Sequence, residues 1–268
     1  ATLHLDVKFP QTKEFLEIKK PDLNALREFY QEMKFMTLLR EVGDGKEETS
    51  QEKTKITKTT QKANYELIDS IDDLEKLVEK LSKKHEIAID TETTSTNPLL
   101  AKLVGIGLSV EEGSAYYIPT NGKIKEEEII SSLTHLFSNE NISFIGHNIK
   151  YDLHVLKTFG LEIKNICFDT MLASYLLNPQ SQRHNLDRLV LENFGKIKIA
   201  ITSLIGEKKP QKSMMDIPIE KVCDYCCEDV DYTLRLKNLF LEKLKSEKLY
   251  DLFSKMELPL LFVLAQME

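Results

Sequence analysis

Short apolar runs alternate with amphipathic helical segments, and this alternation limits the possible folds more than any other feature of the chain. The runs EIAID, LVGIGLSV, GSAYYIP and SFIG have the length and composition of buried strands. Only EEG separates the second run from the third, which predicts a hairpin. Strands that come early, with helices between and after them, predict an α/β domain in which helices cover a mixed sheet.

Helical periodicity and capping residues predict the helices of this domain. Ser70, with Asp73 three residues later, marks one helix start, and Asp169 marks another. Gly160 marks a helix end. The predicted helices are SIDDLEKLVEKLSKK, KEEEIISSLTHLFSN, NIKYDLHVLKTFG, DTMLASYLLNP, NLDRLVLENFG and PIEKVCDYCCEDVDYTLRLKNLFLEKLKSE.

Three further parts flank the domain, which we expect to span residues 65–250. Residues 1–42 contain an amphipathic helical pattern that begins near Pro21 and Asp22. Residues 43–64 are rich in Lys, Glu and Thr and poor in apolar side chains, which predicts a flexible linker. The closing segment, KMELPLLFVLAQME, begins another apolar helix, so residues 251–268 are predicted to open a next domain.

Charge and composition exclude several classes of protein. With 36 basic and 43 acidic residues, the net charge of −7 excludes binding of nucleic acid by a bulk basic field. The longest apolar run, LPLLFVLA, is too short to cross a membrane, and no signal peptide opens the sequence. The four cysteines (Cys167, Cys223, Cys226 and Cys227) lack the two close pairs of a zinc ribbon, so we expect reduced, buried thiols and a cytoplasmic protein.

Two segments place carboxylates beside apolar runs. Asp90 ends the EIAID run, and Glu92, two residues later, points to the same side. Two like charges this close raise each other's pKa unless a cation lies between them. In GHNIKYDLHVL, Asn148 is a candidate helix cap, and Asp152 follows one turn later on nearly the same face.

A third segment, DYCCEDVDYTLRL, adds one more carboxylate. Tyr225 and Asp229 share a helix face whose other residues are mostly apolar or small, where an unpaired charge is costly. Glu228 and Asp231 fall off that face, and we expect them to be solvated. Taken singly, each of these carboxylates is also compatible with an ordinary surface position.

Together, Asp90, Glu92, Asp152 and Asp229 predict a site made of hard oxygen ligands, which suits Mg²⁺ or Mn²⁺. Two such ions about 3.5–4 Å apart can stabilise the attacking and leaving oxygens of a phosphoryl displacement. In that chemistry Tyr225 would orient the attacking water.

The motifs IDTETTS, GHNIKYD and YCCED resemble the three exonuclease motifs of the DEDD superfamily, tyrosine subclass. FDTMLASYLLNP, followed by RHNLDRL, is similar to the 3′–5′ proofreading exonuclease domain of bacterial family A DNA polymerases. The opening of the chain resembles the segment that follows a 5′-nuclease domain, and its close resembles the first polymerase helix.

The resemblance implies a ribonuclease H-like fold and hydrolysis of single-stranded DNA 3′ ends to nucleoside monophosphates with two divalent cations. It also implies polymerase and 5′-nuclease domains in the same parent chain and no membrane partner. The polymerase palm and fingers are not in this sequence, so no DNA synthesis is expected. By the resemblance, Asp90, Glu92 and Asp229 ligate the first metal, Asp152 holds the second, and Tyr225 orients water.

The resemblance also implies a set of residues that contact the terminal nucleotides: Thr91, Thr96, His147, Asn148, Tyr151 and Arg183. Two of them depart from the family. Thr96 stands where a Leu often wedges against the terminal base, a type of contact worth about 1–3 kcal/mol, and Leu99 is a candidate replacement. His147 stands where Gln is common.

Two other functions remain open from the sequence. One is a catalytically silent structural or DNA-binding module of a polymerase. Against it stands the retention of all four carboxylates, because buried acids without a cation destabilise a fold. The other is an exoribonuclease of the same superfamily, which would use the same chemistry on a different sugar.

Overall fold

The computed structural model describes residues 21–33, 35, 38–39, 42, 63–207 and 210–268. The chain divides into two compact units, residues 1–56 and 57–268. In the first unit, helix α2 (Leu23–Glu32) begins where Asp22 Oδ1 accepts hydrogen bonds from the amides of Asn24 and Ala25. This confirms the predicted helix start. The predicted linker lies outside the described residues up to position 62.

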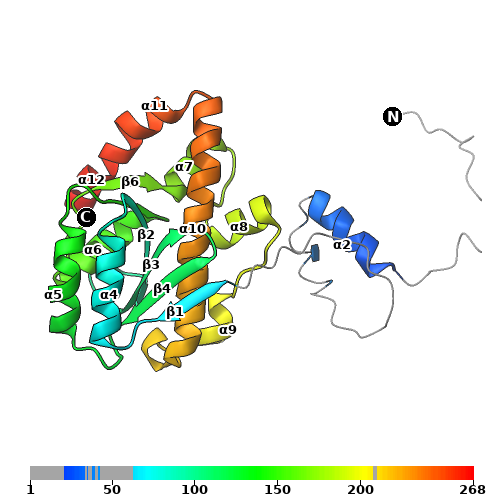
Figure 1. Ribbon diagram of the computed structural model, residues 1–268. Coiled ribbons are helices and arrows are strands. Elements are labelled where there is room, and N and C mark those ends of the chain that lie inside the picture. Colours follow the sequence, from blue (N-terminus) through cyan, green and yellow to red (C-terminus); the bar gives the residue numbers. More distant parts are fainter. Residues whose placement is uncertain (1–20, 34, 36–37, 40–41, 43–62, 208–209) are drawn as a thin grey trace, which may run out of the picture. The chain divides into compact units, whose positions relative to one another are not determined.

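One mixed sheet of six strands forms the centre of the second unit (Figure 1). Its order is β1-β4-β3-β2-β5-β6. Strand β3 pairs antiparallel with both β2 and β4, which confirms the predicted hairpin, and the other pairs are parallel. The strands are β1 (Asn64–Leu67), β2 (Glu86–Thr93), β3 (Leu103–Glu111), β4 (Ser114–Pro119), β5 (Ser143–Gly146) and β6 (Ile166–Asp169).

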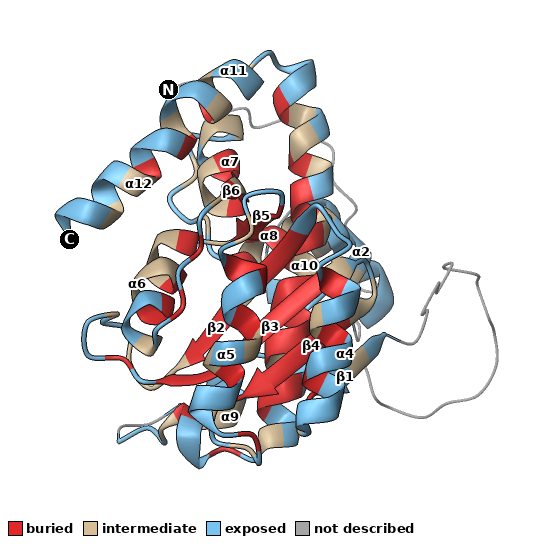
Figure 2. Ribbon diagram, turned by 60° about the vertical axis from the view of Figure 1, so that its left-hand side comes forward, coloured by how far each residue is buried: buried red, intermediate tan, exposed pale blue. Residues whose placement is uncertain are grey.

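Helices cover both faces of this sheet. The long helix α10 packs along one face, and α4 and α5 lie on the opposite face (Figure 1). The helices are α4 (Ile71–Leu81), α5 (Glu126–Phe137), α6 (Ile149–Phe159), α7 (Thr170–Leu177), α8 (Leu186–Phe194), α9 (Ile201–Ile205), α10 (Ile219–Ser246), α11 (Tyr250–Leu252) and α12 (Leu258–Met267), with a 3₁₀ turn η1 (Met214–Asp216) and a π-helical turn η2 (Phe253–Glu257). Figure 2 shows that the central strands β2, β3 and β4 are buried along most of their length.

The predicted helix ends are confirmed at three places. Ser70 Oγ accepts a hydrogen bond from the Asp73 amide at 3.2 Å, at the start of α4. Asp169 Oδ1 accepts hydrogen bonds from the amides of Met171 and Leu172, at the start of α7. Gly160 ends α6 with φ at 101°, a left-handed conformation that glycine adopts without strain.

The structure corrects the prediction for Asn148. Asn148 occupies the N-cap of α6 with φ at 58°, but its side chain makes no capping hydrogen bond. Asp169 takes this role instead, because its Oδ2 accepts the Ile149 amide at 2.8 Å. One carboxylate therefore caps two helices, α7 through Oδ1 and α6 through Oδ2.

Strands β1 and β6 were not predicted, and β2 is longer than predicted. Each of the two missed strands has four residues and lies at an edge of the sheet. Strand β2 continues through Thr93, so Asp90 is not its last residue and Glu92 lies within the strand and not beyond it. Among the described residues, no helix combines the length and the apolar character needed to cross a bilayer.

One glycine of β3, Gly107, allows α10 to approach the sheet closely. Gly107 lies opposite Asp90, and Gly105 lies opposite Glu92. A Cβ atom at Gly107 would lie 2.6 Å from Cys226 Sγ of α10, which is closer than side chains pack. All four cysteines are free thiols, and the three on α10 are buried as predicted.

Gly107→Ala should therefore lower the free energy of unfolding by about 1–3 kcal/mol, because its methyl group overpacks against Cys226. In a Cys226→Ala background the same methyl group meets a smaller side chain, and the cost should fall. Chemical denaturation of the wild type, both single variants and the double variant measures this coupling. Equal costs in the two backgrounds would contradict the close approach of helix and strand.

Candidate active site

A cavity of about 660 Å³ opens at the end of β2. The loop after β2 and the start of α6 line one side, and the segment from α9 to η1 lines the other. Helix α10 contributes Tyr225 and Asp229. The full lining comprises Asp90, Thr91, Glu92, Thr93, Thr94, Ser95, Thr96, Asn148, Tyr151, Ile201, Ile205, Gln211, Lys212, Ser213, Met214, Tyr225 and Asp229.

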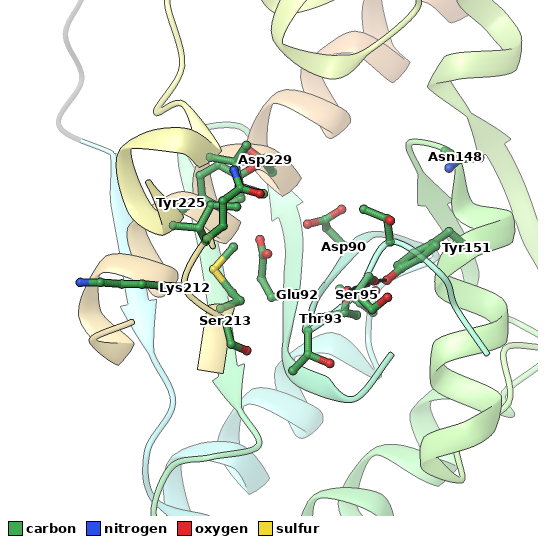
Figure 3. Close-up of a pocket in the computed structure, with 17 residues that line it drawn as sticks. Asp90, Glu92, Thr93, Ser95, Asn148, Tyr151, Lys212, Ser213, Tyr225 and Asp229 are labelled. Atoms are coloured by element: carbon green, nitrogen blue, oxygen red, sulfur yellow. Dashed lines mark hydrogen bonds between the residues drawn. The ribbon is translucent and has the colours of Figure 1, made fainter. Parts of the chain in front are cut away.

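Three carboxylates converge on this cavity. Asp90 and Glu92 come from β2 and Asp229 comes from α10, and Figure 3 shows their carboxyl groups directed toward a common space. Asp90, Glu92 and Cys226 each offer one potential ligand atom, and these three atoms lie within 4.8 Å of one another. Glu92 Oε1 is buried and accepts no hydrogen bond from any described residue. An orphaned carboxylate oxygen beside two further carboxylates fits a bound cation.

The fourth predicted carboxylate, Asp152, lies behind this group. It comes from the first turn of α6 and is buried. Its Oδ1 accepts hydrogen bonds from the Thr91 amide at 3.0 Å and the Thr91 hydroxyl at 2.5 Å. Asp152 therefore faces the cluster through Thr91 and lies outside the lining of the cavity.

Burial raises the pKa of every carboxyl group in the cluster, and repulsion within the cluster adds to the rise at Asp90 and Glu92. Burial, followed by repulsion from Asp152 and Glu92, raises the pKa of Asp90 well above its ordinary range. Burial, with the charge of Asp229, raises the pKa of Glu92 to about 8. Burial raises the pKa of Asp152 to about 7, although hydrogen bonds from Thr91 oppose the change. Without a cation, Glu92 therefore keeps its proton at neutral pH, and Asp152 keeps its proton in part.

A buried lysine that the sequence analysis missed lies against Asp229. The Lys198 side chain is fully buried, and its ammonium forms ion pairs with Asp229 and, at 3.1 Å, with Asp187 Oδ1. Burial acts to lower the pKa of Lys198, but the two carboxylates outweigh burial and raise it, so the ammonium stays charged. Burial raises the pKa of Asp229 to about 6, with Lys198 opposing that rise.

The sequence around Lys198 gave no signal of this role. In KIKIA, Lys and Ile alternate, a pattern typical of lysines that face solvent. The lysine is recognisable as part of the site only when the segment between α8 and α9 is placed against α10.

Tyr225 lies one helical turn before Asp229 and lines the cavity. Burial, with the charge of Asp229, raises its pKa, so the phenol keeps its proton. A neutral hydroxyl next to a carboxylate cluster can both donate and accept a hydrogen bond, which is what holding a water molecule requires.

Four of the six predicted nucleotide contacts line the cavity: Thr91, Thr96, Asn148 and Tyr151. The Tyr151 hydroxyl donates to the Ser95 carbonyl at 2.5 Å and contacts the Thr93 hydroxyl. Tyr151 is therefore held by the loop that follows β2.

The other two predicted contacts lie outside the lining. His147 Nδ1 is 2.9 Å from Thr170 Oγ1, and burial lowers the pKa of the imidazole to about 3, so it is neutral. Arg183 is exposed in the segment before α8. Leu99, the candidate replacement for the missing wedge at Thr96, is 65% exposed and also lies outside the lining.

The prediction that Glu228 and Asp231 are solvated is wrong, because they are 6% and 2% exposed. Glu228 Oε2 accepts the Ile199 amide at 2.6 Å. Asp231 Oδ1 accepts hydrogen bonds from the Gly113 amide at 2.8 Å and from Arg235 Nε at 2.9 Å. Helix α10 is in contact on several sides, so residues off its sheet-facing stripe are buried as well.

Comparison with known proteins places these features in a family. A family model described as 3′–5′ exonuclease matches residues 65–245. DNA polymerase I of Pseudomonas aeruginosa is 29% identical over 100% of this chain and 30% of its own length. DNA polymerase I of Borreliella burgdorferi is 36% identical over 78% of this chain and 23% of its own length. Escherichia coli RNase D, an exoribonuclease, has a TM-score of 0.61 at 22% identity, over 76% of this chain and 51% of its own, which shows the fold alone.

The fold is of the ribonuclease H-like α/β type, and the match of the family model defines the enzyme class, the 3′–5′ exonucleases. The chain belongs to the 3′–5′ exonuclease family of the family A DNA polymerases. Membership implies the use of divalent metal, which agrees with the oxygen-rich cluster. The chain spans 30% and 23% of the two DNA polymerase I relatives.

In EDTA, the raised pKa of Glu92 should make stability fall as pH rises. The folded state keeps the Glu92 proton up to a pKa of about 8, whereas the unfolded chain releases it near the ordinary value of 4.5. The folded state therefore binds more protons across this window, and its free energy of unfolding decreases with pH there.

Glu92→Gln should remove this share of the pH dependence. Its stability gain over the wild type should grow from about pH 5 to about pH 8, as measured by thermal unfolding in EDTA. Glu242→Gln, at an exposed glutamate of α10, is the matched control and should show no such trend. A Glu92→Gln difference that does not change with pH would contradict the raised pKa.

Proposed function

We propose that this chain removes nucleotides from the 3′ ends of single-stranded DNA, as the proofreading exonuclease of a DNA polymerase I. The observation that carries the proposal is the convergence of Asp90, Glu92 and Asp229 around an orphaned buried oxygen, with Asp152 directly behind them. The DNA polymerase I relatives support DNA as the substrate.

The same four carboxylates would hold two divalent cations, Mg²⁺ or Mn²⁺, because donor sets of oxygen suit these hard ions. When bound, such ions supply positive charge that makes a water molecule nucleophilic and stabilises the departing 3′ oxygen. Asp90, Glu92 and Asp229 would hold the first ion, and Asp152 would help to hold the second.

The chain's own residues position the reactants. The Tyr225 hydroxyl, which lines the cavity beside Asp229, would hold the attacking water. The water oxygen bonds to phosphorus, and the bond from phosphorus to the 3′ oxygen of the preceding nucleotide breaks. The products are a nucleoside 5′-monophosphate and a strand that ends in a new 3′ hydroxyl.

The cavity walls favour a single strand over a paired one. Tyr151, Ile201, Ile205 and Met214 offer aromatic and apolar surface on which any base can pack, so little sequence preference is expected. Lys212 extends away from the carboxylates (Figure 3), where its ammonium can meet a phosphate of the strand. A local cation of this kind is needed because the chain as a whole is acidic.

The surrounding segments fit the same proposal. Residues 65–250 would form the exonuclease domain, residues 1–42 would follow a 5′-nuclease domain, and residues 251–268 would begin the polymerase domain. Those domains of the parent chain would then be partners of this one, in the cytoplasm. The support is that both DNA polymerase I relatives are several times longer than the match.

The first test uses single-stranded DNA labelled at the 3′ or the 5′ end, with Mg²⁺ or with EDTA. The 3′ label should be lost at once, the 5′-labelled strand should shorten as a ladder, and EDTA should stop both.

Asp90→Ala should lower kcat at least about a hundredfold, the loss typical of a removed charge-stabilising group. Asp224→Ala, at an exposed aspartate of α10, is the control. Cleavage by Asp90→Ala at the wild-type rate would refute the site.

RNA of the same sequence tests the alternative substrate. DNA should be degraded at least about tenfold faster than RNA, a difference of about 1.4 kcal/mol in transition-state stabilisation. Faster degradation of RNA would favour the exoribonuclease function instead.

Tyr225→Phe should lower kcat by about tenfold to a hundredfold with little change in KM, because the ring remains while the water loses one partner. Steady-state kinetics on the labelled strand separates the two constants. Tyr175→Phe, at a tyrosine that is 51% exposed, removes a hydroxyl outside the cavity and should have no effect. A change in KM alone would mean that Tyr225 binds the strand and does not position water.

A further inference from the structure

Lys198 places a positive charge inside the carboxylate cluster. Its side chain is fully buried between Asp229 and Asp187, and its Nζ lies 5.5 Å from the centre of the Tyr225 ring. The ammonium therefore contacts one of the proposed metal ligands and lies beside the proposed water-positioning residue. Lys212 lines the cavity, which Lys198 does not, but it points away from the carboxylates (Figure 3).

The position of Lys198 gives Asp229 a counter-charge of its own. A carboxylate this buried is costly unless a cation pairs with it. Attraction from the ammonium also acts on the neighbouring Asp90 and Glu92 carboxyls, where it opposes the rise in pKa. The protein thus carries one fixed positive charge among four carboxylates before any ion binds.

A divalent ion and this ammonium cannot share Asp229 without conflict. The ion needs the lone pairs of the same carboxylate, and two positive charges this close repel. Asp187 offers the ammonium a second partner, because it already lies 3.1 Å from Nζ and its side chain is 48% exposed. Lys198 can therefore give up Asp229 and keep Asp187.

We propose that Lys198 is a positioning residue that competes with the divalent cation for Asp229, so that it stabilises the metal-free site and raises the metal concentration that the enzyme requires. This inference rests on the proposed metal-dependent function. In this proposal, the Lys198 ammonium is the counter-charge of the metal-free site. When an ion binds, the ammonium keeps Asp187 as its partner.

The test measures metal binding directly, by thermal shift and calorimetry with Mg²⁺ and with Ca²⁺. Lys198→Gln keeps a hydrogen-bond donor of similar length but removes the charge. The metal concentration at which half of this variant has bound an ion should fall about tenfold or more, which corresponds to about 1.4 kcal/mol in binding free energy. Its melting temperature in EDTA should also fall, because Asp229 loses its partner.

Two controls isolate the charge at this position. Lys196→Gln removes the same charge two residues away, from a side chain that is 49% exposed and pairs with Glu228. It should leave metal binding unchanged. Lys198→Arg keeps the charge and should bind metal as the wild type does.

Asp187→Asn provides a second variant with the opposite expected sign. It removes the negative charge of the alternative partner, which is 48% exposed. Lys198 should then hold Asp229 more tightly, and the required metal concentration should rise about threefold or more, a difference of about 0.7 kcal/mol. This variant also keeps the proposal testable if Lys198→Gln does not fold. A required concentration that is unchanged or lowered would then overturn it.

An unchanged or raised metal requirement in folded Lys198→Gln would overturn the competition, since a lysine that merely orients Asp229 for the ion gives that result. The outcome for the wild type is separate. If the wild type neither binds metal nor degrades DNA, the proposed function fails. If the wild type does both while Lys198→Gln binds metal as before, the role of Lys198 alone fails.

Discussion

The removal of four carboxyl groups from water is the constraint that the rest of this fold has to satisfy. Four acids come together at the end of β2, where burial makes each of them costly to ionise, and repulsion from Asp152 and Glu92 adds to that cost at Asp90. Close packing of α10 against Gly107 of β3 holds Asp229 and Tyr225 beside the other acids despite that cost. The buried carboxyl groups lower the free energy of unfolding, and the apolar core on both sides of the sheet offsets this loss.

Much of this arrangement could be predicted because it depends on local rules. The longer strands and helices have clear periodicity, and the caps at Ser70 and Asp169 use contacts within three residues. Four of the carboxylates and their chemistry could be proposed from spacing and from the family motifs. The distances between these carboxylates could not be predicted from the sequence. In the structure, Asp152 lies behind Thr91 and not in the cavity wall.

The features that sequence reasoning missed all depend on distant partners. Strands β1 and β6 are short edge strands that are defined by the neighbour with which each pairs. Glu228 and Asp231 are buried because other segments cover the outer sides of α10. Lys198 belongs to an alternating segment that predicts solvent exposure, and only its contact with Asp229 makes it part of the site. In each case, tertiary contact overrides a local pattern.

The double cap formed by Asp169 has a consequence for how the molecule tolerates change. A single carboxylate holds the first turns of α6 and α7, and Asp152 lies three residues after the amide that it caps. An amide side chain offers only one acceptor oxygen, so asparagine at this position could serve one helix but not both. One carboxylate outside the cavity, through its two oxygens, therefore holds the first turns of two helices, and with them one of the four acids, in position.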